Sequence, residues 1–169
     1  IVNHYRSGHK ICILSGLSGT GKTQAAIEFL HTHAQSFDNY IWISGEDWPE
    51  RTPLTSIQRA RGGFPINISG LFNSTKTLLV IDNLNRVIDQ TELEELSNGF
   101  ILGGVVLATS QFTNHSDKIY LPIPELSTEV AFKIIGQNQH DATDNCKNFI
   151  AKCKFSPLIL ATARDIARE

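Results

Sequence analysis

The sequence predicts an α/β fold built on a five-stranded, mostly parallel sheet flanked by helices. Two observations lead to this prediction: five short apolar blocks recur along the first 125 residues, and segments with helical periodicity alternate with them. Each block is apolar on both faces, as expected for strands of a parallel sheet that is covered on both sides. The five blocks span residues 11–14, 40–43, 78–81, 105–108 and 119–121.

The clearest helical segment lies between the first two blocks, over residues 22–34. Its apolar and aromatic residues follow the i, i+3, i+4, i+7 spacing of one helical face. The residues on this face are Ala26, Phe29, Leu30 and His33. A strand, this helix and the next strand form a βαβ unit, which is the building block of a parallel sheet.

The pattern changes after Pro122 and Pro124, where the apolar blocks end and helical segments follow. These segments span residues 127–135, 141–152 and 156–168. We therefore expect two domains: an α/β domain over residues 1–125 and the beginning of a helical domain over residues 126–169.

Residues 50–75 are rich in Pro, Gly, Ser and Asn, which predicts a long polar connection. A weak helical pattern covers residues 53–60. The connection also carries Arg51, Arg59 and Arg61, which we interpret as solvated surface side chains rather than phosphate contacts.

Composition excludes several classes of function. The 169 residues carry a formal net charge of -2, so the chain has no overall basic field that would hold a nucleic acid backbone. The longest apolar run, residues 100–108, is far shorter than the roughly 20 residues of a membrane-spanning helix. The three cysteines lack C-x-x-C spacing, which favours reduced thiols and a cytoplasmic location. Because the chain lacks Met and starts at Ile1, we expect a segment of a larger protein.

A complete phosphate-loop motif, G-x-x-x-x-G-K-[ST], follows the first predicted strand and opens the predicted helix. It comprises Gly16, Leu17, Ser18, Gly19, Thr20, Gly21, Lys22 and Thr23. Glycines let successive backbone N–H groups curl around a phosphate without a Cβ in the way, and the helix N-terminus adds positive potential. The motif therefore predicts a nucleotide site in which Lys22 reaches the β- and γ-phosphates and the Thr23 hydroxyl binds Mg²⁺.

The Mg²⁺ of a nucleotide also needs a carboxylate, for which Asp82 is the strongest candidate. It directly follows the apolar block 78–81, where a charge without a partner would be costly for structure alone. We therefore predict that Asp82 binds Mg²⁺ together with Thr23.

Beyond these two motifs, the sequence resembles the NB-ARC domains of the STAND class of signal-transduction ATPases. Three further segments match the order and spacing of that family: F-D-x-Y-I-W-I at 37–43, V-L-A-T-S-Q at 106–111 and F-S-P-L-I-L at 155–160. The segment Q-A-A-I-E-F, which begins at Gln24, is most similar to bacterial and fungal members. The resemblance covers nearly the whole chain.

This resemblance implies ATP or ADP as ligand, Mg²⁺ as cofactor and a P-loop NTPase sheet of strand order 2-3-4-1-5. It also implies a molecular switch between an ADP-bound closed monomer and an ATP-bound oligomer. The expected partners are then the nucleotide, and further copies or other domains of the full-length protein. Position by position, the phosphate loop with Gln24 matches the nucleotide-binding segment, and Asp82 matches the Mg²⁺ aspartate. Pro157 matches the proline that packs near the adenine, and Thr109 and Ser110 fall where the family senses the γ-phosphate.

Three positions depart from the family pattern. The residue after Asp82 is often acidic in the family, but here it is Asn83, whose amide cannot accept a proton from an attacking water. Gln111 stands where many members have Arg, and Phe155 stands where a glycine usually precedes the helical proline. With Asp82 and Asn83 as the candidate catalytic residues, we expect slow ATP hydrolysis at most.

Two other functions fit the same motifs. The chain could be a conventional P-loop ATPase or small-molecule kinase, although the sequence shows neither an arginine-rich lid nor a clear acceptor site. It could also be a scaffold in which nucleotide only adds stability, and such a protein would adopt one conformation with either nucleotide.

Overall fold

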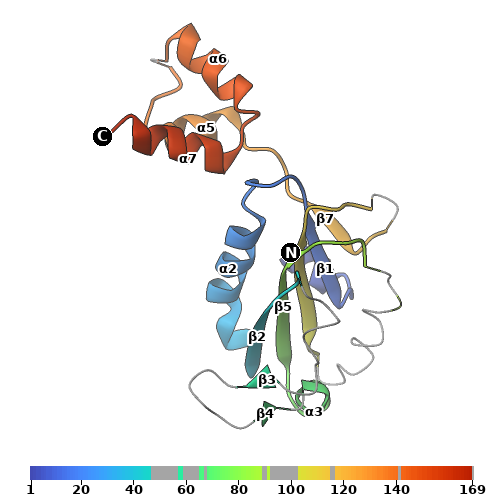
Figure 1. Ribbon diagram of the computed structural model, residues 1–169. Helices are drawn as coiled ribbons and strands as arrows, with labels where there is room; N and C mark the ends of the chain where they lie inside the picture. Colours follow the sequence, from blue (N-terminus) through green and yellow to red (C-terminus); the bar gives the residue numbers. More distant parts are fainter. Residues whose placement is uncertain are drawn as a thin grey trace. The chain divides into compact units, whose positions relative to one another are not determined.

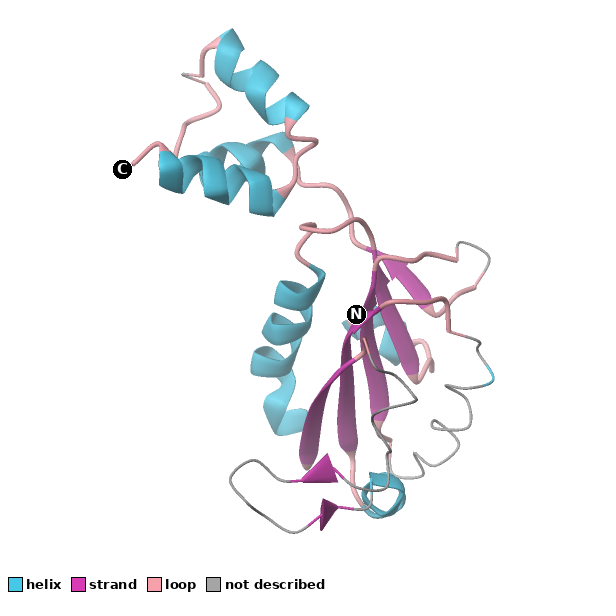
Figure 2. Ribbon diagram, in the orientation of Figure 1, coloured by secondary structure: helices cyan, strands magenta, loops and turns pink. Residues whose placement is uncertain are grey.

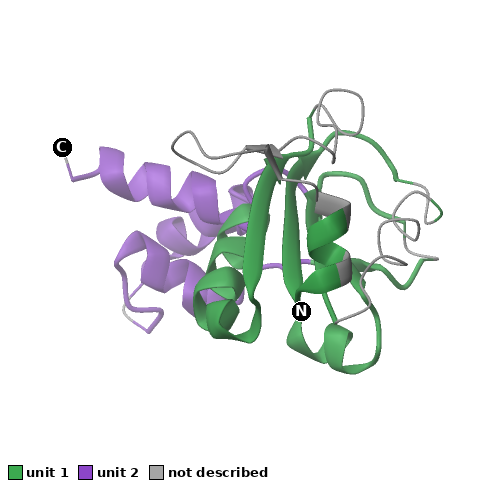
Figure 3. Ribbon diagram, turned by 90° about the horizontal axis from the view of Figure 1, so that it is seen from below, with its two compact units in different colours: residues 1–16, 22–122 green, residues 17–21, 123–169 purple. Residues whose placement is uncertain are grey.

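The computed structural model contains two compact units, which Figure 3 colours green and purple. Unit 1 comprises Ile1–Gly16 and Lys22–Pro122, and unit 2 comprises Leu17–Gly21 and Ile123–Glu169. The structure describes residues 1–46, 57–58, 65–66, 68–88, 91, 103–114, 117–140 and 142–168.

Unit 1 contains the predicted sheet, and its five strands all run parallel (Figure 1). In chain order the strands are β1 (Ile11–Ser15), β2 (Asn39–Ser44), β5 (Thr77–Leu84), β6 (Val105–Ser110) and β7 (Tyr120–Pro122). They lie in the order β2-β5-β6-β1-β7. The predicted five-stranded parallel sheet and its strand order 2-3-4-1-5 are therefore confirmed.

The central strands of the sheet form the core of unit 1 because they are apolar on both faces. Ile13 in β1, Leu79 in β5 and Leu107 in β6 are fully buried. Helix α2 (Lys22–His33) packs against β5 and β6, and the short α1 (Val2–Arg6) packs against β1. Burial of each large aliphatic side chain contributes about 1.5–3 kcal/mol, so this core holds the ends of the strands in fixed positions.

The connection between β2 and β5 contains elements that the sequence did not predict. Strand β3 (Ile57–Gln58) lies within residues 53–60, where the sequence shows a weak helical pattern. It pairs in antiparallel fashion with β4 (Pro65–Ile66), and α3 (Ile68–Ser74) then leads into β5. At β3, cross-strand pairing therefore overrides the weak helical pattern. The other residues of that range lie outside the described ones, as do Arg51, Arg59 and Arg61.

Unit 2 contains the three predicted helices, drawn in cyan in Figure 2. They are α5 (Thr128–Ile135), α6 (Asp144–Lys152) and α7 (Pro157–Ile166). Ser127 and Thr143 cap the first two helices, each accepting a hydrogen bond from a backbone N–H three residues on at 3.3 Å. The sequence pattern placed the start of α6 at residue 141. The helix begins later, at Asp144, because Thr143 is its N-cap. Among the described residues, no helix combines the length and apolar character that crossing a membrane requires.

The ends of β2 and β5 approach each other closely at Gly45, the buried residue that follows β2. The Gly45 N–H donates a hydrogen bond to the carbonyl of Asp82 at 2.5 Å. A Cβ at Gly45 would lie 2.9 Å from both the backbone nitrogen and Cδ2 of Leu84, closer than real Cβ atoms come to their neighbours. Only glycine therefore fits at this position. The close contact with Leu84 and the hydrogen bond to Asp82 hold the backbone in place just beyond β2.

Gly45→Ala is expected to lower the free energy of unfolding by about 1–3 kcal/mol, because the added methyl group meets backbone atoms of β5 that cannot move aside alone. Val87→Ala trims a half-exposed side chain of the same unit and should change stability by less than about 0.5 kcal/mol. Chemical denaturation measures both differences. Equal stability of Gly45→Ala and wild type would contradict the close approach of the two strand ends.

Candidate functional site

The phosphate-loop motif connects the end of β1 to the start of α2. Gly19 and Gly21 adopt φ angles of 77° and 91°, in the left-handed region that favours glycine. A Cβ at Gly21 would meet no atom within 4 Å, so the backbone conformation rather than space requires glycine there. Loops of this kind can direct successive N–H groups at an anion.

Lys22, the first residue of α2, is a buried lysine with 9% of its surface exposed. Its ammonium group donates a hydrogen bond to the carbonyl of Gly16 at 2.9 Å. Burial lowers the pKa of Lys22, and the nearby carboxylate of Asp82 partly opposes this shift. A partly desolvated ammonium attracts an anion more strongly than a hydrated one does, so this position favours an anionic ligand.

Asp82 lies at the carboxyl end of β5 and accepts two hydrogen bonds on one oxygen. The Thr23 hydroxyl donates to Asp82 Oδ1 at 2.9 Å, and the Thr109 hydroxyl donates to the same atom at 2.6 Å. Thr23 belongs to α2 and Thr109 to β6. We call these three residues the Asp82 cluster. It lies at the carboxyl edge of a parallel sheet, where α/β proteins bind their ligands.

The donor atoms of the Asp82 cluster fit Mg²⁺. Carboxylate and hydroxyl oxygens are hard ligands, and Mg²⁺ is usually held by one or two carboxylates together with water and substrate phosphates. In the described part of the chain, no group of three or more His, Cys, Asp and Glu side chains could enclose a metal ion. A cluster with one carboxylate suits a metal that arrives with an anionic ligand.

The structure separates the two predicted sensor residues. Thr109 belongs to the Asp82 cluster, whereas the Ser110 hydroxyl is buried and donates to the carbonyl of Leu84 at 3.1 Å. It also accepts a hydrogen bond from the Phe112 N–H at 3.0 Å. The structure thus brings Thr109, and not the Ser110 hydroxyl, to Asp82.

Asn83 follows Asp82 in the left-handed conformation, with a φ angle of 64°. The pairing of β5 with β6 shifts register between Ile81 and Leu84, so Asn83 sits in a bulge. Its backbone N–H donates to the Thr109 hydroxyl at 2.8 Å. Asn83 is therefore joined to the Asp82 cluster through its backbone, while its exposed side chain points elsewhere.

That side chain meets Glu46, which the sequence analysis missed. Asn83 Nδ2 donates a hydrogen bond to Glu46 Oε1 at 2.7 Å. A weak signal was present, because Glu46 is the first charged residue after the apolar block 40–43, from which Ser44 and Gly45 separate it. Polar residues just past the ends of adjacent parallel strands are expected to meet at one edge of the sheet.

Unit 2 contains a pocket of about 360 Å³ beside the phosphate-loop residues Leu17, Ser18 and Thr20. Its wall includes Pro157, the first residue of α7, and Ile159. Two hydrogen bonds of 3.4 and 3.5 Å join the Gly19 carbonyl to the start of that helix. Predicted loop residues and Pro157 therefore line one pocket, whereas Gln24 is exposed on the first turn of α2 in unit 1.

Phe155 adopts a φ angle of 51°, in the left-handed region, just before α7. This is a backbone conformation that glycine adopts without strain. The Phe155 side chain packs against the core of unit 2, which includes Phe132 and Leu160. Apolar packing thus offsets the strain of a left-handed aromatic residue.

Comparisons with known proteins bear on the fold. No protein-family model matches the chain, and no curated protein sequence matches it. A solved structure, AMPPCP-bound DnaA from Aquifex aeolicus, is similar with a TM-score of 0.51 and 15% sequence identity over 84% of this chain. The match spans 50% of that DnaA chain. The chain therefore has an α/β fold similar to that of part of DnaA, with a five-stranded parallel sheet and the G-x-x-x-x-G-K-[ST] motif after its first strand.

Proposed function

We propose that the chain is the ATP/ADP-binding switch module of a signal-transduction regulator similar to the NB-ARC proteins of the STAND class. The observation that carries this proposal is the Asp82 cluster, in which a strand-end carboxylate contacts the hydroxyl that follows the phosphate-loop lysine. Fold similarity to DnaA, solved with AMPPCP bound, supports a nucleotide as the ligand. The motif resemblance supports the switch.

The nucleotide would engage the chain through three groups of atoms. Backbone N–H groups of Leu17–Gly21 and the ammonium of Lys22 would bind the phosphates, next to Gln24 on the first turn of α2. Thr23 and Asp82 would hold Mg²⁺, which when bound neutralises charge on the phosphates. The apolar pocket that Pro157 lines would accept the adenine, because flat bases bind well in such pockets.

A switch requires that ATP and ADP bind two conformations with different free energies. Thr109 provides the coupling in this proposal, because its hydroxyl both donates to Asp82 and accepts from the Asn83 N–H. A cation at Asp82 would compete for the oxygen that Thr23 and Thr109 now share. Occupancy of the site would thereby change hydrogen bonds at the end of β5, which another domain or a second copy could detect.

Lys22→Ala is expected to weaken Mg–ATP binding by about 10- to 100-fold, because a charged hydrogen bond to phosphate contributes about 1.5–3 kcal/mol. Isothermal titration calorimetry measures the change. Lys118→Ala, which removes an exposed lysine of unit 1 outside the motif, is the matched control and should bind as wild type does. Equal affinities of wild type and Lys22→Ala would refute the role of the phosphate loop.

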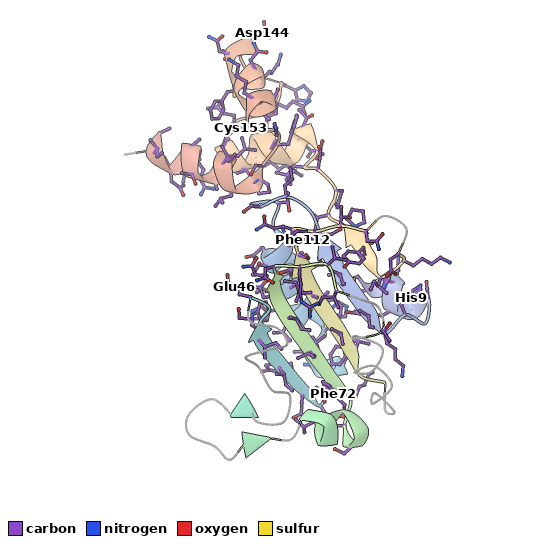
Figure 4. All side chains as sticks on the ribbon, turned by 45° about the vertical axis from the view of Figure 1, so that its right-hand side comes forward. His9, Glu46, Phe72, Phe112, Asp144 and Cys153 are labelled. Carbon is purple, nitrogen blue, oxygen red and sulfur yellow. The ribbon has the colours of Figure 1, made fainter. Side chains whose placement is uncertain are left out.

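Asp82→Asn is expected to weaken ATP binding about tenfold or more in Mg²⁺, because the amide is a poor ligand for that ion. In excess EDTA the same variant should bind as well as wild type or better, since it removes a negative charge near the phosphates. Asp144→Asn changes an exposed carboxylate of α6 (Figure 4) and serves as control. An equal loss in both solutions would assign Asp82 a structural role instead.

A further inference from the structure

We propose that Glu46 is the general base of ATP hydrolysis in this chain, the residue that accepts the proton of the attacking water. The inference rests on the proposed nucleotide site and extends it to the reaction. The position after Asp82 offers only the amide of Asn83, but the fold brings a carboxylate from the neighbouring strand to that amide. Figure 4 shows Glu46 at the end of β2, away from Phe72 at the opposite end of the sheet.

Backbone constraints hold Glu46 in place. Gly45 lies so close to Leu84 that no larger residue fits, which fixes the chain one residue before Glu46. The backbone of Glu46 makes two further hydrogen bonds: its carbonyl accepts from Asn85 Nδ2 at 2.9 Å, and its N–H donates to the Ser44 hydroxyl at 3.3 Å. The carboxylate is thus carried by a positioned segment, which a general base requires.

The Glu46 carboxylate is linked to the metal-binding carboxylate by consecutive hydrogen bonds. Asn83 Nδ2 donates to Glu46, the Asn83 N–H donates to Thr109, and Thr109 donates to Asp82 Oδ1. Both Glu46 and the Asn83 side chain are exposed, so water reaches them. Asn83 lies in the bulge of β5 with a left-handed φ angle, and its amide contacts Glu46 from there.

Asn83 and Glu46 have different roles in the proposed hydrolysis: Asn83 orients the attacking water, and Glu46 accepts its proton. With its NH₂ group donating to Glu46, Asn83 can accept a hydrogen bond from the attacking water on its amide oxygen. In the reaction, the water oxygen forms a bond to the γ-phosphorus as the bond from that phosphorus to the β,γ-bridging oxygen breaks. The electron pair of the broken bond leaves with ADP, one water proton passes to the Glu46 carboxylate, and phosphate is the second product. Glu46 then returns its proton to solvent.

Glu46→Gln is the critical variant, because its side-chain oxygen can still accept the hydrogen bond from Asn83 but cannot take up a proton. Loss of a general base lowers rates by about 10²- to 10⁴-fold. We expect single-turnover hydrolysis of Mg–ATP to fall by at least about 100-fold, with Kd for Mg–ATP within about threefold of wild type. Glu129→Gln, at an exposed glutamate of α5, is the matched control and should retain the wild-type rate.

Asn83→Glu gives a second, independent test. If the missing acid after Asp82 limited the reaction, this variant would be faster than wild type. With Glu46 as the base it is no faster, because the substitution removes the amide whose hydrogen bond holds the Glu46 carboxylate. A rate increase of about tenfold or more in Asn83→Glu, together with a wild-type rate in Glu46→Gln, would overturn the assignment of Glu46.

The binding measurement separates this inference from the proposed function. Wild type that binds Mg–ATP but shows no single-turnover hydrolysis would overturn the role of Glu46 and leave the binding site standing. Wild type that fails to bind Mg–ATP would refute the proposed function, and the role of Glu46 with it.

Discussion

The carboxylate of Asp82 is the group on which the rest of the site depends. Through one oxygen it joins the first turn of α2, the end of β5 and the end of β6. Its electrostatic effect also reaches Lys22, where it opposes the pKa decrease that burial causes. A ligand that engages this carboxylate must therefore alter hydrogen bonds in three elements at once. This coupling is what a nucleotide-controlled switch needs from a single site.

Much of the fold could be predicted because burial leaves a clear pattern in the sequence. Strands covered on both faces, such as β5 and β6, have to be continuously apolar, and only a few arrangements connect such strands through helices. The phosphate loop could be predicted for a similar reason, since positive φ angles at Gly19 and Gly21 demand glycine. Asp82 stood out because a charge that ends a buried strand needs a partner.

The remaining features depend on contacts between segments that are distant in the chain. Glu46 contacts Asn83 because β2 lies next to β5 and because Gly45 lets the carboxyl ends of these two strands approach closely. Thr109 and Ser110 are adjacent, and the sequence could not show which hydroxyl faces Asp82, because successive side chains in a strand point in opposite directions. Strand β3 is too short for its pairing with β4 to be visible as a periodic pattern.

In the proposed switch, the nucleotide state at Asp82 changes the hydrogen bonds at the carboxyl edge of the sheet. Hydrogen–deuterium exchange of the chain, saturated in turn with Mg–ADP and Mg–AMPPCP, compares the two states directly. We expect different protection in the peptides that contain Gly45 and Asn83, with equal protection in the peptide that contains α6. Identical exchange in every peptide, at saturation confirmed by calorimetry for both nucleotides, would contradict it.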